Sequence, residues 1–114
     1  MGHEASGTIA AIGSGVTSVA VGDRVAVEPG TPCRFCSACK RGTYNLCRQM
    51  RFAAAPGPPD TQGTLSKYFA IAEDFVYRVD ERISLQEAVM IEPLSVGVHA
   101  VKLADVRPGE TVVV

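Results

Sequence analysis

Long apolar runs are missing from this chain. The apolar stretches of its 114 residues are short and are interrupted by glycine, proline or charged residues. None approaches the roughly 20 apolar residues with which a helix spans a bilayer. The first seven residues also lack the basic region and apolar core of a secretory signal peptide. The sequence therefore predicts no membrane partner and a reducing, cytoplasmic setting.

An excess of charge of one sign is missing as well. Eleven Lys and Arg residues are balanced by twelve Asp and Glu residues, which gives a net charge of −1. Both signs are spread along the chain, whereas nucleic-acid-binding domains carry a basic patch or stripe. Nucleic acid is therefore excluded as an expected partner. The length suits one ordinary domain with a modest core.

Cysteine is absent outside one short stretch. All four cysteines lie within fifteen residues with the spacing C-x2-C-x2-C-x7-C: Cys33, Cys36, Cys39 and Cys47. Four thiolates over so short a span are typical of a closed tetrahedral zinc site. Paired disulfides would suit a secreted mini-protein, and iron–sulfur clusters usually have other spacings. We therefore favour zinc, and because a closed site leaves no position for substrate, we expect this zinc to be structural.

Positive charges accompany the cysteines. Zinc bound by four thiolates leaves about two net negative charges. Four cationic side chains in the same stretch can offset them: Arg34, Lys40, Arg41 and Arg48. Four unrelated structural thiols are the alternative, but chance rarely places three cysteines at successive three-residue steps. The pattern predicts a zinc lobe over residues 32–48.

The first two thirds of the chain carry the pattern of short strands. Apolar or alternating segments bounded by glycine and proline predict strands at residues 5–12, 24–28, 64–71 and 75–79. Gly13-Ser14-Gly15 is no dinucleotide loop, because a β-rich run follows it where a helix is required. Residues 56–63 are rich in proline and glycine and predict an exposed loop.

The hydrophobic period changes after residue 83. Ser84-Leu85-Gln86-Glu87 fits a capping box and predicts a short helix that runs to about residue 91. Pro93 lacks an amide hydrogen and therefore suits the first turn of a second helix, over residues 94–103. The sequence thus predicts a small, mainly β domain that leads through two helices into an α/β one.

Residues 111–114 are wholly apolar and follow the Pro108-Gly109 turn. They predict a buried strand, and a buried strand needs neighbours to pair with. We therefore expect a piece of a larger protein. Residues 1–83 would form part of one domain, and residues 84–114 would be the connecting helices and the start of the next.

A second group of metal-ligating residue types is split between the two ends of the chain. His3 and Glu4 lie at the start, and Glu92 lies near the start of the second predicted helix. A histidine near a terminus is commonly solvated, and a glutamate in a first helical turn interacts favourably with the helix dipole. Histidine and carboxylate also ligate zinc. On residue types alone, the solvated interpretation is preferred to a second metal site.

Four motifs change this interpretation when they are taken in order. They are Gly2-His3-Glu4-Ala5-Ser6-Gly7, Gly22-Asp23-Arg24-Val25, the four cysteines, and Glu92-Pro93-Leu94-Ser95-Val96-Gly97-Val98-His99. In this combination the sequence resembles the zinc-dependent medium-chain dehydrogenases, most closely their polyol branch, the sorbitol and xylitol dehydrogenases. The resemblance covers nearly the whole chain. It implies a mainly β, GroES-like domain with two zinc sites, followed by a Rossmann domain.

The resemblance also implies roles for individual residues. His3 would be a ligand of a catalytic zinc, Glu4 its neighbouring carboxylate, and Glu92 a nearby carboxylate that often acts through water. The four cysteines would hold the structural zinc, and Phe52 would line the substrate pocket. Alcohol dehydrogenases have a cysteine where Glu92 stands. Threonine dehydrogenases share the carboxylate but resemble this chain less in the residues that follow.

The implied reaction is oxidation of a secondary alcohol of a polyol to a ketose, with zinc as Lewis acid and NAD as hydride acceptor. In the family a further zinc ligand, a cysteine, lies upstream of the His3 motif, and the cofactor loop follows the strand at residues 111–114. We therefore expect an inactive fragment of a homo-oligomeric enzyme. The alternatives are a zinc-stabilised β interaction module without catalysis, or another medium-chain alcohol or threonine dehydrogenase. The particular polyol and the choice between NAD and NADP stay open.

Overall fold

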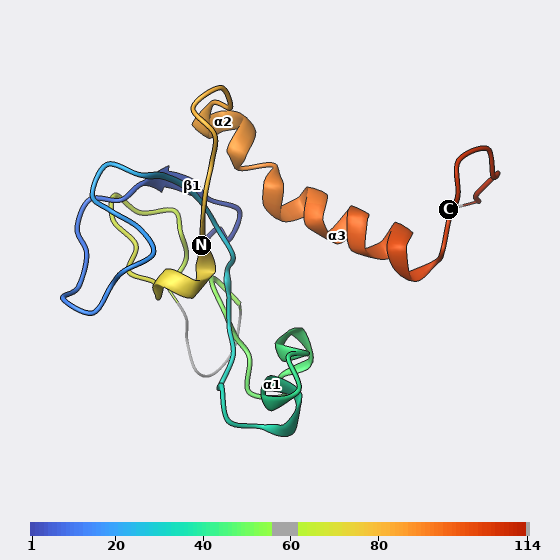
Figure 1. The fold of residues 1–114 in the computed structure, drawn as a ribbon, viewed down its shortest axis with the longest axis horizontal. Coiled ribbons are helices and arrows are strands. Elements are labelled where there is room, and N and C mark those ends of the chain that lie inside the picture. Colours follow the sequence, from blue (N-terminus) through green and yellow to red (C-terminus); the bar gives the residue numbers. More distant parts are fainter. Residues whose placement is uncertain (56–61, 114) are drawn as a thin grey trace.

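The structure is a computed structural model that describes residues 1–55 and 62–113. Figure 1 shows three parts: a small β region that contains the N-terminus, a lobe around helix α1, and two C-terminal helices. The longer of these, α3, projects away from the β region. The prediction of a mainly β domain followed by helices is confirmed.

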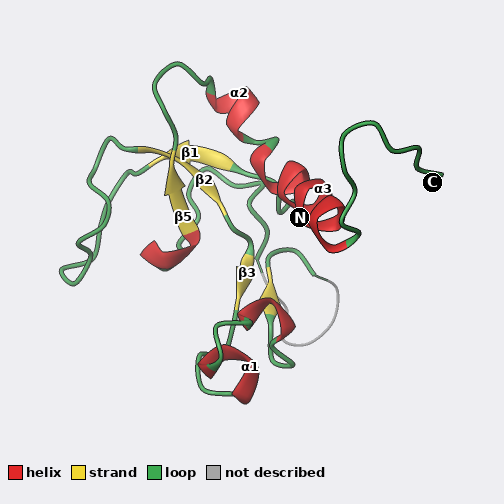
Figure 2. Ribbon diagram, turned by 45° about the vertical axis from the view of Figure 1, so that its right-hand side comes forward, coloured by secondary structure: helices red, strands yellow, loops and turns green. Residues whose placement is uncertain are grey.

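The β region is built on a three-stranded antiparallel sheet. Its strands are β1 (Ser6–Thr8), β2 (Arg24–Val27) and β5 (Val76–Arg78), in the order β1-β2-β5. The register pairs Ser6 with Ala26 and Ala26 with Tyr77. Strand β2 therefore lies at the centre, where both of its edges are hydrogen-bonded (Figure 2).

The hydrophobic core is small and surrounds this central strand. Val25 and Ala26 are consecutive and each is only 3% exposed. Because consecutive strand residues point to opposite faces, β2 is covered on both sides. Among the described residues, every buried side chain is apolar. These side chains are Val19, Val25, Ala26, Pro29, Pro32, Ala38, Cys47, Ala53, Phe75 and Ala88.

A two-stranded sheet forms the base of the cysteine lobe. Strands β3 (Gly30–Thr31) and β4 (Arg51–Phe52) pair antiparallel, so the two ends of the lobe lie side by side (Figure 2). Between them the chain forms the short helix α1 (Ser37–Lys40) and the 3-10 turn η1 (Tyr44–Leu46). The lobe is therefore an excursion between two paired strands.

The C-terminal helices are α2 (Leu85–Ala88) and α3 (Ile91–Leu103). The predicted capping box is confirmed: the Glu87 amide donates to Ser84 Oγ at 3.2 Å, and the Ser84 amide donates to Glu87 Oε2 at 2.7 Å. Pro93 lies in the first turn of α3, as predicted, but α3 begins three residues earlier than expected. Within residues 1–55 and 62–113, no helix has the length and apolarity needed to cross a membrane.

Two predicted strands are wrong. Residues 64–71 form none: the amides of Thr64 and Leu65 donate to the carbonyls of Gly2 and Met1, and the pairing stops there. Residues 111–113 also form no strand, and residue 114 lies outside the described residues. A strand persists only where a neighbour supplies hydrogen-bond partners. An alternating or apolar pattern indicates that a segment is suited to form a strand. Among the described residues, however, neither of these two segments has a partner strand.

Two other strands are shorter than predicted. The strand predicted over residues 5–12 is confined to β1, and the one predicted over 75–79 is confined to β5, because the 3-10 turn η2 (Glu73–Phe75) occupies its start. Gly13-Ser14-Gly15 is followed by no helix, which agrees with the rejection of a dinucleotide loop. Most of the predicted loop at residues 56–63 lies outside the described residues.

Candidate metal centres

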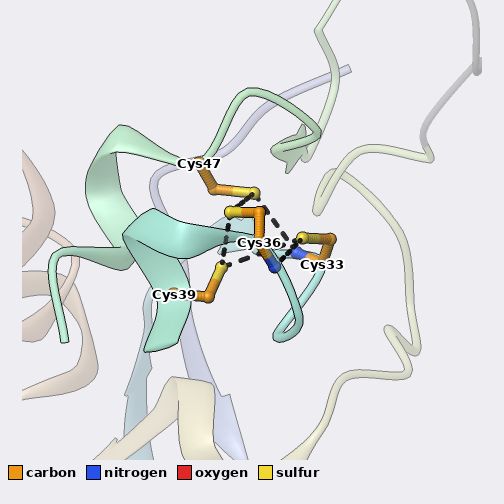
Figure 3. Close-up of side chains that lie close together, drawn as sticks. All are labelled: Cys33, Cys36, Cys39 and Cys47. Carbon is orange, nitrogen blue, oxygen red and sulfur yellow. Dashed lines mark hydrogen bonds between the residues drawn. The ribbon is translucent and has the colours of Figure 1, made fainter. Parts of the chain in front are cut away.

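The four cysteine side chains of the lobe converge on one point (Figure 3). The sulfur atoms of Cys36 and Cys39 are 3.5 Å apart, and Cys33 to Cys39 and Cys36 to Cys47 are each 3.9 Å. All four lie within 4.8 Å of one another. A zinc–sulfur bond of about 2.3 Å in a regular tetrahedron requires sulfur atoms about 3.8 Å apart. The spacing of these sulfurs therefore fits a tetrahedral zinc ion.

Local backbone structure brings these thiols together. Cys36 is the N-cap of α1, Cys39 lies within that helix, and Cys47 directly follows η1. The backbone amide of Cys36 donates to Cys33 Sγ, and that of Cys33 donates to Cys47 Sγ, both at 3.4 Å. Amide donors stabilise the thiolate form that binds a metal. These two hydrogen bonds thus hold the sulfur atoms of Cys33 and Cys47 in place within the lobe.

The thiols are unequal in acidity. Hydrogen bonds from the backbone and side chain of Cys39 lower the pKa of Cys36 to about 6. The backbone hydrogen bond from Cys33 lowers the pKa of Cys47. Burial raises the pKa of Cys39 to about 12. The cluster therefore contains both thiols that ionise readily and a thiol that keeps its proton until a cation replaces it.

The second group of ligand types also comes together. The ligand atoms of His3, Glu4 and Glu92 lie within 4.8 Å of one another, although His3 and Glu92 stand near opposite ends of the sequence. One imidazole and two carboxylates are suitable zinc ligands, and three protein ligands leave a fourth position open. His3 and Glu4 are exposed and Glu92 is half-buried, so solvent reaches the cluster. The structure thus groups the residues that the resemblance implied, and their roles remain predictions.

The position of His3 depends on a close backbone approach just before it. Gly2 has φ of +84°, and its carbonyl accepts the amide of Thr64 at 2.8 Å. At Gly63 an added Cβ would lie only 2.1 Å from the carbonyl oxygen of Met1. Residue 63 therefore has to be glycine for the chain to pass here. No sequence pattern singles out Gly63, which lies in the segment predicted to be a loop.

The position of Glu92 depends on how α2 is attached to the sheet. Glu92 lies in the first turn of α3, directly after α2. Ala88 of α2 is fully buried, and Ser6 Oγ in β1 donates to the Leu85 carbonyl at 2.6 Å. Because His3 precedes β1 closely, this attachment brings both ends of the chain to one place. In the sequence, Ser6 is notable only as part of the motif at residues 2–7, and this contact was not predicted.

Arg24 secures the segment that leads into α2. Its guanidinium donates to the carbonyls of Glu81 at 3.0 Å and Ile83 at 2.6 Å. Its neighbour Asp23 forms an ion pair with Arg78 at 3.1 Å. The Gly22-Asp23-Arg24 motif is one of the four on which the family resemblance rests. Its side chains thus join β2 to β5 and to the segment that precedes α2.

Phe52 lies beside the second cluster. Its ring and that of His3 meet edge to face, with centroids 5.3 Å apart and an angle of 64° between the planes. Phe52 therefore borders the candidate metal position, and its role in a substrate pocket stays a prediction. Two hollows of about 510 and 520 Å³ lie elsewhere, one against Phe69 and the other against Met50. Neither is lined by His3, Glu4 or Glu92.

Comparison with known proteins identifies relatives of this chain. Residues 1–81 match the sequence profile described as "Alcohol dehydrogenase GroES-like domain". The whole chain is 59% identical to D-xylulose reductase A of Aspergillus oryzae, of which it covers 31%.

Two solved structures from Escherichia coli superpose closely. An oxidoreductase of unknown specificity matches 96% of this chain and 31% of its own, with a TM-score of 0.87 and 41% identity. An alcohol dehydrogenase from strain CFT073, complexed with cofactor NADH, matches the same shares with a TM-score of 0.84 and 31% identity.

The chain thus spans about a third of the length of the relatives that it matches. The profile covers the β region and the cysteine lobe, and the relative covers the helices too. The resemblance inferred from the four motifs is confirmed. This chain belongs to the alcohol dehydrogenase GroES-like domain family of the zinc-dependent medium-chain dehydrogenases.

Proposed function

We propose that this chain supplies the zinc-binding β domain of a polyol dehydrogenase. The enzyme would oxidise a secondary alcohol of a polyol such as xylitol or sorbitol to a ketose. The observation that carries this proposal is the convergence of His3, Glu4 and Glu92 from opposite ends of the chain. The 59% identity to a D-xylulose reductase supports the polyol as the substrate class.

We propose His3, Glu4 and Glu92 as the residues that would hold the catalytic zinc. A zinc ion there supplies a Lewis acid that lowers the pKa of a bound hydroxyl. The two carboxylates bring two negative charges, which match the charge of the ion. Glu92 lies in the first turn of α3, where the helix dipole interacts favourably with a negative charge. Its half-buried carboxylate can hold the water that carries a proton away from the substrate.

Phe52 would form one wall of the substrate position. Its ring meets that of His3 edge to face and presents an apolar surface beside the candidate zinc ligands. Such a surface excludes water from one side of the bound alcohol and suits its C–H bonds. Substrate hydroxyls would then be oriented towards Glu4 and Glu92.

The four cysteines would hold the structural zinc. Their sulfur spacing matches the edges of a tetrahedron, and Cys47 is buried. A closed set of four thiolates leaves no position for substrate. This ion would therefore stabilise the lobe between β3 and β4 and take no part in the reaction.

The remaining parts of the enzyme lie outside this domain. Residues 1–83 would belong to the catalytic domain, and residues 84–114 would lead towards a domain that binds NAD, the hydride acceptor. The proposed enzyme is a cytoplasmic homo-oligomer whose partners are a polyol and other copies of itself, without nucleic acid or membrane. The related structure with NADH supports a nicotinamide cofactor.

Turnover of the complete protein tests this proposal. We expect oxidation of xylitol or sorbitol with NAD, and little activity with ethanol or threonine. His3→Ala should lower kcat/KM on the order of 100-fold or more, because residues that only support a metal ligand already contribute 10 to 100-fold. The 114-residue chain alone should be inactive. A preference for threonine or ethanol, or an unchanged His3→Ala variant, would contradict the proposal.

A further inference from the structure

We propose that Arg34 is a positioning residue that couples occupancy of the cysteine zinc site to the packing of the lobe on the β sheet. The inference rests on the proposed structural zinc. It concerns six side chains, here termed the lobe–sheet cluster, that join the lobe to the β region. They are Glu28, Arg34, Tyr44, Asp74, Phe75 and Tyr77.

Arg34 lies in the two-residue loop between the proposed zinc ligands Cys33 and Cys36. It follows Cys33 directly and has φ of 69°, a left-handed conformation that residues other than glycine seldom adopt. Such a conformation persists where the surroundings fix it. Here the Cys36 amide donates to Cys33 Sγ and closes the loop that contains Arg34. The direction of the Arg34 side chain is thus set by the loop that the metal would fix at both ends.

The Arg34 side chain reaches from this loop to the β region. One guanidinium nitrogen lies 2.7 Å from Asp74 Oδ2, and the guanidinium carbon lies 5.5 Å from the centre of the Phe75 ring. Phe75 is only 4% exposed and directly precedes β5. Arg34 therefore combines an ion pair with a cation–π contact on a core aromatic ring.

The other end of the lobe contacts the same region. Tyr44, in η1 shortly before Cys47, donates its hydroxyl to Glu28 Oε2 at 3.1 Å, and Tyr77 donates to the same oxygen at 2.7 Å. The Tyr44 ring also packs edge to face against Phe75 at 6.3 Å. Both segments that carry zinc ligands thus converge on Phe75 and the start of β5.

This arrangement implies a reciprocal coupling. If zinc orders the Arg34 loop, it favours the contacts with Asp74 and Phe75, and those contacts must favour zinc binding by the same factor. The coupling can extend beyond the cluster, because Glu73, next to Asp74, accepts the amides of Thr17 and Ser18 at 3.0 and 2.7 Å. Occupancy of the lobe would thereby stabilise the turn η2 and strand β5.

An isolated surface ion pair is the alternative explanation. The Arg34 and Asp74 side chains are 55% and 54% exposed, and exposed pairs by themselves contribute little. The pair Arg82–Asp80, at 2.8 Å, provides a matched control, because it is exposed and makes no contact with the lobe. A coupling specific to zinc has to distinguish the two pairs.

A double-mutant cycle on zinc affinity makes this distinction in the 114-residue chain. Zinc affinity is measured by competition with a chelator for wild type, Arg34→Ala, Asp74→Ala, the double variant and Asp80→Ala. We expect each variant at 34 or 74 to bind zinc about 3 to 10-fold more weakly. The double variant should be no weaker than the more damaging single one. Asp74→Glu should recover part of the affinity, and Asp80→Ala should match wild type.

Two further measurements identify the cause of the loss of zinc affinity. With Co2+ in place of zinc, Arg34→Ala should keep the wild-type absorption spectrum, because all four sulfur ligands remain. Hydrogen exchange at the amides of Val76–Arg78 should increase when zinc is removed from wild type, and should already be faster in zinc-loaded Arg34→Ala. The coupling would be overturned, with the zinc site intact, by any of three results. The losses of zinc affinity in the two single variants could be strictly additive, or Asp80→Ala could lose as much affinity as they do. The rate of amide hydrogen exchange could also be the same with and without zinc. Absence of any zinc binding would overturn the proposed site itself.

Discussion

The hydroxyl of Ser6 donates a 2.6 Å hydrogen bond to the carbonyl of Leu85, which stands 79 residues later in the chain. Ser6 begins β1, three residues after His3, and Leu85 begins α2, which leads into Glu92 at the start of α3. The bond therefore fixes the distance between the two ends of the candidate catalytic site. Residues that hold such a site in register need not touch the substrate.

Replacement of this hydroxyl should loosen the site. Ser6→Ala is expected to cost about 1 kcal/mol of stability, the usual net contribution of one hydrogen bond, and to lower turnover of the complete protein more than twofold. Thermal unfolding and steady-state kinetics are the measurements. Ser66→Ala is the control, since Ser66 makes a local 2.9 Å bond to the Tyr68 carbonyl in an exposed segment. Equal effects of the two changes would refute a positioning role for Ser6.

Gly63→Ala should displace the residues before His3. The new Cβ would lie 2.1 Å from the Met1 carbonyl oxygen, so the backbone must move. The Thr64–Gly2 hydrogen bond would be strained or lost, at a cost of about 1 kcal/mol or more. We expect a large change in the His3 imidazole signals in NMR spectra. Gly15→Ala, where a Cβ meets nothing within 4 Å, should leave these signals unchanged.

Removal of the structural zinc should destabilise the lobe first. Its buried apolar contacts are few, because only Pro32, Ala38 and Cys47 are buried among residues 32–48. A lobe with so small a core depends on its metal for stability. Chelation should therefore lower the melting temperature and expose residues 32–48 to protease before the sheet unfolds. Restoration of the wild-type digestion pattern by added zinc is the control, and digestion that is insensitive to metal would contradict the prediction.

Glu73 should make stability depend on pH. Its Oε2 accepts hydrogen bonds from the Ser18 hydroxyl and from the amides of Ser18 and Thr17, and these lower the pKa of its carboxyl group. The pKa of this carboxyl group is therefore lower in the folded state than in the unfolded state, where it is about 4.3. The stabilisation from the ionised carboxylate is complete above the unfolded-state pKa. It is lost as the pH falls through the folded-state pKa. Glu73→Gln should therefore be less stable than wild type at pH 7, and this deficit should shrink as the pH is lowered towards 3.

Chemical denaturation at the two pH values measures this difference. Glu81→Gln is the matched control, because the Glu81 side chain makes none of these contacts and only its backbone carbonyl accepts a bond, from Arg24. If Glu73→Gln lowers the free energy of unfolding by the same amount at pH 3 and pH 7, the charge of the Glu73 side chain does not account for the loss of stability.

The sequence predicted best what depends on neighbours in the chain. The cysteine spacing indicated the sulfur cluster, and Ser84 with Glu87 indicated the cap of α2. Both are settled by residues that lie close together along the backbone. The His3–Glu92 grouping came from the family resemblance, because no local pattern connects two residues at opposite ends of the chain.

What the sequence did not predict depends on tertiary partners. The Ser6–Leu85 bond, the close approach at Gly63 and the Arg34–Asp74 pair arise only when distant segments meet. The strand predicted over residues 64–71 failed for the same reason, since a suitable pattern forms no strand without a neighbour. Functional geometry here is largely a matter of such long-range contacts.

Metal analysis of the purified 114-residue chain tests the central claim most directly, because the proposed structural zinc would organise the lobe. We predict about one zinc per chain, as expected for one closed set of four thiolates. This zinc should be lost in Cys47→Ser and kept in His3→Ala. A folded wild-type chain that binds no zinc, or a Cys47→Ser variant that keeps its full zinc content, would contradict the account.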